Sequence, residues 1–331
     1  MREVLLRRID FAPPEEEIAA AAALADRVAR ERGRLAGALQ IAVGAGDAVT
    51  LGRFQSACGR APRRATGGHA VFAGRGTLGL TILLPGPAAW LDEPLPALDR
   101  LPNRMVRGVL AGLRAAGFDA SYPGRDVVRA RGNAVALVGV ERDRAGVCWV
   151  AARIGVGASP APPDLEEWPG GTRSPLAGAA ALGVADAVPV ADAIADAYRR
   201  RHALAFVAAA PDEAERAFHP DAAEPAAGAP LVGPARDVPL GTLRAAVRLA
   251  PDGTLAAVGF RSEWLASSAG VAALERALVG APLDAEALRA RMAPVLADPQ
   301  HFFLGYGGVE TLARAVLEAA TPGSARSPAK A

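Results

Sequence analysis

Four short apolar segments with β-strand character follow one another between residues 39 and 85. They read LQIAVG, AVTLGRF, HAVFAG and TLGLTILLP, and segments containing glycine or proline separate them. Short runs rich in β-branched and apolar residues, bounded by glycine or proline, are typical of strands. We therefore expect adjacent strands, and a sheet of this kind needs helices to cover it.

Two amphipathic helices are expected on either side of these segments. In residues 15–32 the acids come first and the arginines last, which complements a helix dipole. In residues 103–117, Met105, Val109 and Leu113 recur on one face at helical spacing.

The sequence then returns to β-like composition. Residues 126–130, 133–142 and 146–157 predict strands, and a turn-like DRAG joins the last two into a hairpin. Helical segments follow at 177–182 and 190–201. The chain therefore predicts an α+β fold, with a mixed sheet flanked by helices.

A change of composition divides the 331 residues into two domains. We expect the first domain over residues 1–208 and a linker without apolar periodicity over 209–235. Two β-like runs around an Asp-Gly turn and three helical segments predict a small α+β domain over 236–320. Residues 321–331 are expected to be a disordered tail.

Composition argues against several classes of function. The chain has 37 basic and 35 acidic residues, giving a net charge of +2, and no long basic block that would favour nucleic acid. Two cysteines and four histidines lack metal-site spacing, so we expect no metal. No leader or membrane-spanning run is evident, so we expect a cytoplasmic protein without a membrane partner.

Lysine is almost absent from the sequence. The only one is Lys330, next to the end, and arginine supplies all other basic side chains. A mechanism that needs a lysine in a folded site is therefore excluded.

The most distinctive stretch covers residues 51–85. A GRFQ motif is followed by RRATGGHAVFAG, and a second block, YPGRDVV, contains Asp126. These motifs resemble those of the lipoate-protein ligase A family, in the biotin and lipoate ligase superfamily. Residues 236–320 also resemble the accessory domain of its long members, so the resemblance covers nearly the whole chain.

The resemblance implies a ligase that activates lipoate or a medium-chain acid such as octanoate with ATP and Mg²⁺. The acyl-adenylate would then pass its acyl group to a lysine of a lipoyl carrier domain. Carriers in the family belong to 2-oxoacid dehydrogenases or are the glycine cleavage H protein.

The resemblance also implies a binding site at the glycine loop. Backbone amides of Gly67 and Gly68 can approach a phosphate closely, because no side chain intervenes. Arg64 can pair with phosphate or carboxylate, and Thr66 can donate a hydroxyl hydrogen bond. The remaining positions expected to contact substrate or adenylate are His69, Val71, Thr77, Asp126 and Ala136.

The loop departs from the family pattern at the positions that carry chemistry. His69 replaces the third glycine, Ala73 an expected histidine and Thr77 an expected asparagine. The family lysine lies three residues before a glycine. Here either Ala136 or Arg129 takes that position, and we favour Ala136.

Loss of this lysine charge leaves alternatives open. One is a catalytically silent homologue that binds a ligand or partner and regulates. Another is an acyl transferase that uses Cys148, with Cys58 a weaker candidate. His69 could contact phosphate, act as a general base or merely cap a strand. The arginines that could replace the lost charge, or simply lie on a solvated hairpin edge, are Arg129, Arg131, Arg142 and Arg153.

Overall fold

The computed structural model describes residues 2–45, 47–55, 61–92, 98–124, 126–157, 184, 186–216 and 231–321. The expected helix at 177–182, residues 217–230 of the expected linker and residues 322–331 of the expected tail lie outside these ranges. Among the helices described, none is long and apolar enough to cross a membrane.

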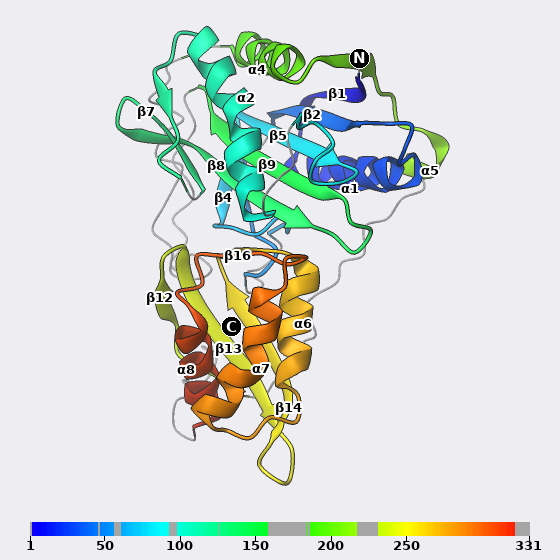
Figure 1. Cartoon of the computed structure of the whole chain (residues 1–331). Coiled ribbons are helices and arrows are strands. Elements are labelled where there is room, and N and C mark those ends of the chain that lie inside the picture. The colour runs from blue at the N-terminus through cyan, green and yellow to red at the C-terminus, as the bar shows by residue number, and fades with distance from the viewer. Residues whose placement is uncertain are drawn as a thin grey trace.

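An eight-stranded mixed sheet forms the larger unit (Figure 1). Its strands are β1 (Arg2–Ala12), β2 (Gly37–Gly44), β5 (Thr77–Leu84), β6 (Ala120–Ser121), β7 (Val127–Ala130), β8 (Asn133–Arg142), β9 (Cys148–Gly155) and β10 (Leu204–Ala208). The order across the sheet is β10-β1-β2-β5-β9-β8-β7-β6. β1 runs parallel to β10 and β2, and the other neighbours are antiparallel.

Helices cover both faces of this sheet, as predicted. α1 (Pro14–Arg30) packs on β2 and β5, whereas α2 (Leu101–Ala115) packs on β8 and β9 from the opposite face. α4 (Val188–Arg201) lies beside α2 and β10, and a 3₁₀ turn, η1 (Leu98–Arg100), leads into α2. The predicted hairpin is β8–β9, whose pairing runs from Ala136–Ile154 to Arg142–Cys148.

The β-like segments from residue 39 to 85 do not all join the large sheet. β2 and β5 pair with each other, but β3 (Asp47–Thr50) and β4 (Val71–Gly74) form a separate two-stranded ribbon. The chain between β3 and β4 is the arginine- and glycine-rich segment, so this ribbon holds the two ends of that loop together. We expected all four segments to be adjacent strands. The structure differs because β3 and β4 pair with each other and not with the strands of the large sheet.

A second unit follows from residue 231 and has its own core (Figure 1). Strands β11 (Leu231–Val232), β12 (Arg236–Val238), β13 (Gly241–Leu249) and β14 (Leu255–Ser262) form its sheet. β15 (Leu265–Ala266) pairs with β16 (Phe303–Leu304), and the helices are α6 (Ser268–Leu278), α7 (Ala285–Ala297) and α8 (Val309–Ala320). The hairpin around the Asp-Gly turn is β13–β14, as the sequence indicates.

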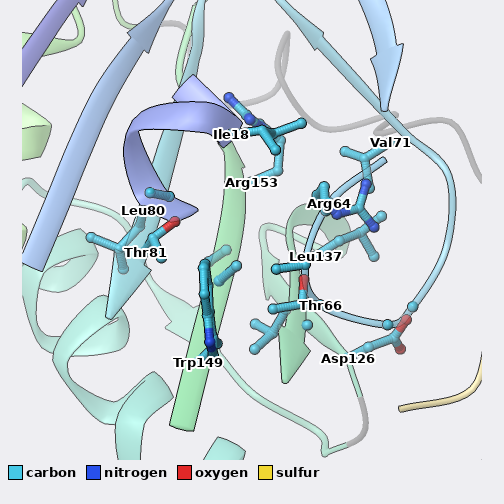
Figure 2. A pocket seen from close by; sticks show the side chains of 18 of the residues that line it. Ile18, Arg64, Thr66, Val71, Leu80, Thr81, Asp126, Leu137, Trp149 and Arg153 are labelled. Atoms are coloured by element: carbon cyan, nitrogen blue, oxygen red, sulfur yellow. The ribbon is translucent and has the colours of Figure 1, made fainter. Parts of the chain in front are cut away.

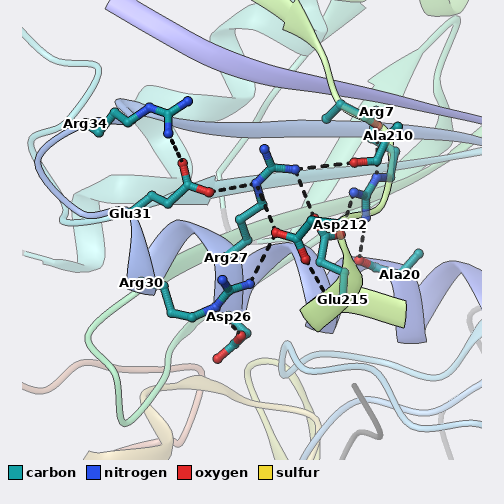
Figure 3. A network of polar contacts seen from close by, with 11 residues as sticks. Arg7, Ala20, Asp26, Arg27, Arg30, Glu31, Arg34, Ala210, Asp212 and Glu215 are labelled. Atoms are coloured by element: carbon teal, nitrogen blue, oxygen red, sulfur yellow. Dashed lines mark hydrogen bonds and ion pairs between the residues drawn. The ribbon is translucent and has the colours of Figure 1, made fainter. Parts of the chain in front are cut away.

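Part of the expected linker is held against the first unit. α5 (Glu213–Arg216) lies on α1, and its Glu215 is buried between Arg7 and Arg27 (Figure 3). Glu215 Oε2 lies 2.5 Å from Arg7 Nη2, and Glu215 Oε1 lies 3.2 Å from Arg27 Nη1. Because these charges are shielded from water and paired, residues 213–216 pack as part of the first unit.

Candidate functional site

Two consecutive arginines organise the loop between β3 and β4. Arg63 Nη1 donates to the carbonyls of Gly52 and Gln55, at 3.2 and 2.5 Å. Arg64 Nη1 donates to the carbonyl and hydroxyl oxygens of Thr50, and its Nη2 donates to the His69 carbonyl at 2.5 Å. Both side chains thus hold backbone in place.

Arg64 faces a second cation. Burial, together with the nearby Arg153 charge, lowers the pKa of Arg64 to about 9, although Glu17 acts in the opposite direction. Arg64 therefore remains protonated at neutral pH. Its bonds to Thr50 and His69 brace the loop, and the ligand contact that the sequence suggested for Arg64 stays a prediction.

A pocket lies beneath this loop, between α1 and the face of the sheet that α1 covers (Figure 2). Apolar side chains from four elements form part of its wall, including Ile18, Leu80, Leu137 and Trp149. Of the nine residues we expected at the binding site, seven line the pocket: Arg64, Thr66, Gly67, Gly68, His69, Val71 and Asp126.

Gly139 lets the loop approach β8 closely. A Cβ atom built on Gly139 would lie 2.6 Å from Thr66 Oγ1 and 2.8 Å from the Gly67 carbonyl oxygen. Real side chains do not pack at such distances, so a larger residue here would displace the loop. Gly139 follows Ala136 by three residues, the spacing by which we placed the missing lysine at Ala136.

His69 and Asp126 form a side-chain pair at the pocket. His69 Nε2 lies 3.0 Å from Asp126 Oδ2, and the two side chains are 11% and 5% exposed. The loop supplies the histidine, and the aspartate lies just before β7. Segments almost 60 residues apart in the sequence therefore meet here.

Three buried polar atoms of pocket residues have no hydrogen-bond partner among the described residues. They are Thr66 Oγ1, His69 Nδ1 and Arg153 Nη1. Leaving such atoms unpaired is costly, so unpartnered groups within one pocket indicate a site for a polar ligand or water.

A buried ion pair that the sequence did not reveal lies in the same pocket. Arg153 Nη2 and Glu17 Oε2 are 2.7 Å apart, with side chains 5% and 7% exposed. Glu17 comes from the first turn of α1, and its carboxylate occupies the space where a Cβ of Gly79 would lie. Only the three-dimensional approach of α1 to β5 and β9 brings these charges together.

The second unit contacts the glycine loop directly. The Gly68 amide donates to the Trp264 carbonyl at 3.1 Å, and a Cβ on Gly67 would lie 2.5 Å from that same oxygen. We expected the amide of Gly68 to approach a phosphate. In this arrangement its hydrogen is directed to Trp264 instead, because the second unit is docked here.

The GRFQ motif also lies at this contact. Gln55 Oε1 accepts from the Gly52 amide at 2.7 Å, and Gln55 Nε2 donates to Glu263 Oε1 at 3.2 Å. Glu263 in turn accepts from the amide and the hydroxyl of Thr242. The motif therefore joins the two units within this structure.

Two expected site residues lie outside the pocket. Ala136 is fully buried in the apolar core and does not line the pocket, whereas Leu137, Val138 and Gly139 of the same strand do. Thr77 is also buried and donates to the Gly74 carbonyl at 2.7 Å. The position at which we placed the family lysine, Ala136, therefore lies outside the lining of this pocket.

The cysteines and arginines considered as candidates differ in whether they lie at the pocket. Cys148 is buried in the core on the α2 side of the sheet, and burial raises the pKa of its thiol to about 12. Cys58 lies outside the described residues. Of the four arginines considered for the missing charge, Arg153 lines the pocket, whereas Arg129, Arg131 and Arg142 do not.

The sequence matches no family model, and a search of curated proteins finds no relative. Solved structures do resemble the fold. P. falciparum LipL1, in complex with lipoate, matches with a TM-score of 0.63 at 10% identity, over 95% of this chain and 99% of that one. A bipartite lipoate protein ligase from Thermoplasma acidophilum, described with its E2 lipoyl domain, matches with a TM-score of 0.50 at 17% identity, over 66% and 90% of the two chains. The chain therefore has the lipoate-protein ligase fold, as the motifs predict.

Proposed function

We propose that this chain binds a carboxylic acid in the pocket beneath the glycine loop and transfers its acyl group to a carrier protein. The ligand we favour is lipoate or a medium-chain acid such as octanoate. The acceptor we favour is the lysine of a lipoyl carrier domain, as found in 2-oxoacid dehydrogenases and the glycine cleavage H protein. The chemistry would proceed through an acyl-adenylate made with ATP and Mg²⁺.

The observation that carries this proposal is the composition of the pocket. Apolar walls suit an acyl chain, and the unpartnered Thr66 hydroxyl and Arg153 Nη1 can donate to the oxygens of a carboxylate or phosphate. Two fold relatives support the choice of ligand and acceptor, since one was solved with lipoate and the other is described with a lipoyl domain.

A nucleotide phosphate fits the loop only in part. Thr66 and Arg153 are suitable donors, but the Gly68 amide donates to Trp264. ATP, if bound here, would supply the leaving group that activates the carboxylate, and Thr66 and Arg153 would hold its charge. We assign residues 1–208 to catalysis and 236–320 to an accessory role, joined by 209–235, of which α5 packs on the first unit and β11 pairs with β13 of the second.

A second candidate is a silent homologue that binds a ligand without turnover. One observation favours it: Lys330 is the only lysine of the chain, and none of the described residues that line the pocket is a lysine. In the family, that charge stabilises the phosphate during transfer.

One experiment distinguishes the two candidates. The purified chain is incubated with ATP, Mg²⁺, a panel of short and medium carboxylic acids and apo carrier domain, and the products are followed by intact mass. An acylated carrier supports the ligase. Binding of an acid without transfer supports the silent homologue, and failure to bind any acid contradicts both.

A matched pair of variants assigns the result to the pocket. Thr66→Val removes the unpartnered hydroxyl, whereas Thr311→Val changes a threonine of α8 that does not line the pocket. We expect weaker binding for Thr66→Val alone.

A further inference from the structure

The described residues that line the pocket include no lysine, but they include a histidine and an aspartate in contact. His69 occupies the position where the family pattern has glycine, so the imidazole is an addition to the loop. Among the described residues, His301 and Asp298 form another such pair, but they lie in the second unit and do not line the pocket.

The hydrogen-bonding state of His69 favours one role for each ring nitrogen. Nε2 lies 3.0 Å from the Asp126 carboxylate, so the carboxylate stabilises the tautomer with its proton on Nε2. Nδ1 is then an acceptor, and it is buried without a partner. Because His69 lines the pocket, an unpartnered lone pair on Nδ1 can take a proton from a bound group.

Backbone contacts fix both members of the pair. Arg64 holds the His69 carbonyl, and the amide of Val138 on β8 donates to the Asp126 carbonyl at 2.6 Å. The imidazole is therefore held between two braced segments, which a general base needs in order to keep its geometry during a reaction.

We propose that His69 is the catalytic base of acyl transfer and that Asp126 is its positioning residue. This inference rests on the proposed function. The acceptor amine attacks the acyl carbonyl carbon, and a new C–N bond forms. The amine proton passes to His69 Nδ1, and the bond from the acyl carbon to the phosphate oxygen breaks with its electron pair leaving on the nucleotide. The imidazolium then returns its proton to water.

A general base in this pocket has a clear chemical purpose. A lysine amine is mostly protonated at neutral pH, and the attacking nitrogen must also lose a proton as the amide forms. An imidazole exchanges protons near neutral pH, and a carboxylate beside it stabilises the imidazolium that results. Other charged or titratable groups around the site are Arg64, Arg153 and Glu17 in the pocket, and Tyr122, on which the Asp126 charge acts.

The test separates transfer from activation. Synthetic octanoyl-AMP and lipoyl-AMP are supplied to the full-length protein, and single-turnover transfer to apo carrier domain is measured between pH 5.5 and 9. We expect His69→Gln to lower the transfer rate about 100-fold, with the Kd for a non-hydrolysable acyl-AMP analogue changed less than about threefold. The pH profile of the transfer rate should differ between His69→Gln and the wild type. Asp126→Asn should lower the rate less, and His301→Gln should match the wild type.

A second variant guards against a purely structural effect. His69→Gly restores the glycine of the family pattern and leaves space for added imidazole, which should raise its transfer rate in a concentration-dependent way. A His69→Gln variant that keeps both the wild-type rate and its pH dependence overturns the role of His69, while leaving the ligase proposal intact. Wild-type protein that binds the analogue but transfers nothing overturns both.

Discussion

The carboxylate of Glu141 on β8 accepts a hydrogen bond from the backbone amide of Ser268, the first residue of α6, at 2.7 Å. A side chain of the first unit thereby caps a helix of the second. Glu141 is 1% exposed, and Arg53 Nε lies 4.0 Å from its other oxygen. Burial raises the pKa of Glu141 to about 8, although Arg53 and the Ser268 amide act in the opposite direction.

This contact predicts a specific pH dependence of stability. Between pH 4.5 and 8 the folded protein holds a proton on Glu141 that the unfolded chain has lost, so the Glu141 contribution to stability declines as pH rises. Glu141→Gln keeps an acceptor for Ser268 but cannot ionise. We expect a flatter stability profile and a gain of a few kcal/mol at pH 8, measured by urea unfolding at pH 5, 6.5 and 8. Equal pH slopes for the two proteins would contradict this.

Phe54 predicts how strongly the two units are coupled. It belongs to the first unit but packs in the core of the second, with its ring centroid 6.2 Å from that of Trp264. Phe54→Ala should cost about 3–5 kcal/mol of unfolding free energy and speed limited proteolysis between the units. Phe11 is 74% exposed, so Phe11→Ala should stay within about 0.5 kcal/mol of wild type. If the two variants behave alike, Phe54 does not couple the units.

Gly139 should be intolerant of a single methyl group. In Gly139→Ala the new Cβ meets Thr66 and the Gly67 carbonyl, so the loop must move away from β8. We expect loss of ligand binding by calorimetry and a lower melting temperature. Gly259 on β14 has no neighbour within 3.4 Å of the same Cβ position, so Gly259→Ala is the matched control and should bind normally. Normal binding by Gly139→Ala would show that the loop does not depend on this close approach.

The sequence predicted most elements whose patterns are local. The hairpin β8–β9, the helices α1 and α2 and the Asp-Gly hairpin β13–β14 all follow from periodicity and turn residues. β1 was missed because its sequence carries several charged residues, and burial of Arg7 depends on Glu215, about 200 residues away. The edge strand β10 has no charged residue, but it is short and its partner β1 lies about 200 residues earlier in the sequence, so no local pattern indicates their pairing.

In the candidate site, too, local motifs predicted some residues but not the contacts between distant segments. Glycines and arginines of the loop were identified from their motif, but their partners were not, because no local pattern encodes the approach of Trp264 to Gly68 or of Glu17 to Arg153. Ala136 was expected at the site but does not line the pocket, and motif spacing alone does not determine which face of a strand a residue occupies. The register of β8 against β9 decides that.

Cys148 should be chemically inert in the folded protein. With its pKa raised to about 12, only about one thiol in 10⁴ is ionised at pH 8. In a Cys58→Ser background, Cys148 should resist iodoacetamide at pH 8 in the folded protein. It should react fully once about 6 M guanidinium has unfolded the chain. Cys148→Ser should leave acyl transfer unchanged. Rapid alkylation of Cys148 in the folded protein would support the acyl transferase that uses a Cys148 thioester.

The buried pair of Glu17 and Arg153 predicts a strongly non-additive mutant cycle. Removing only one partner leaves the other charge buried without compensation, so Glu17→Met or Arg153→Met alone should cost about 3–5 kcal/mol. The double variant removes both charges and keeps apolar volume on the shared boundary of α1, β5 and β9, so its cost should be well below the sum of the single costs. Asp26→Asn removes the partner of Arg30 in a half-exposed pair and should cost no more than about 1 kcal/mol. Chemical unfolding of the wild type, the two single variants, the double variant and Asp26→Asn measures these free energies. Additive single costs would show that the two charges act independently.

Calorimetry on the double variant then separates stability from ligand contact. Weaker binding of octanoate by a stable double variant would identify Arg153 as a ligand donor.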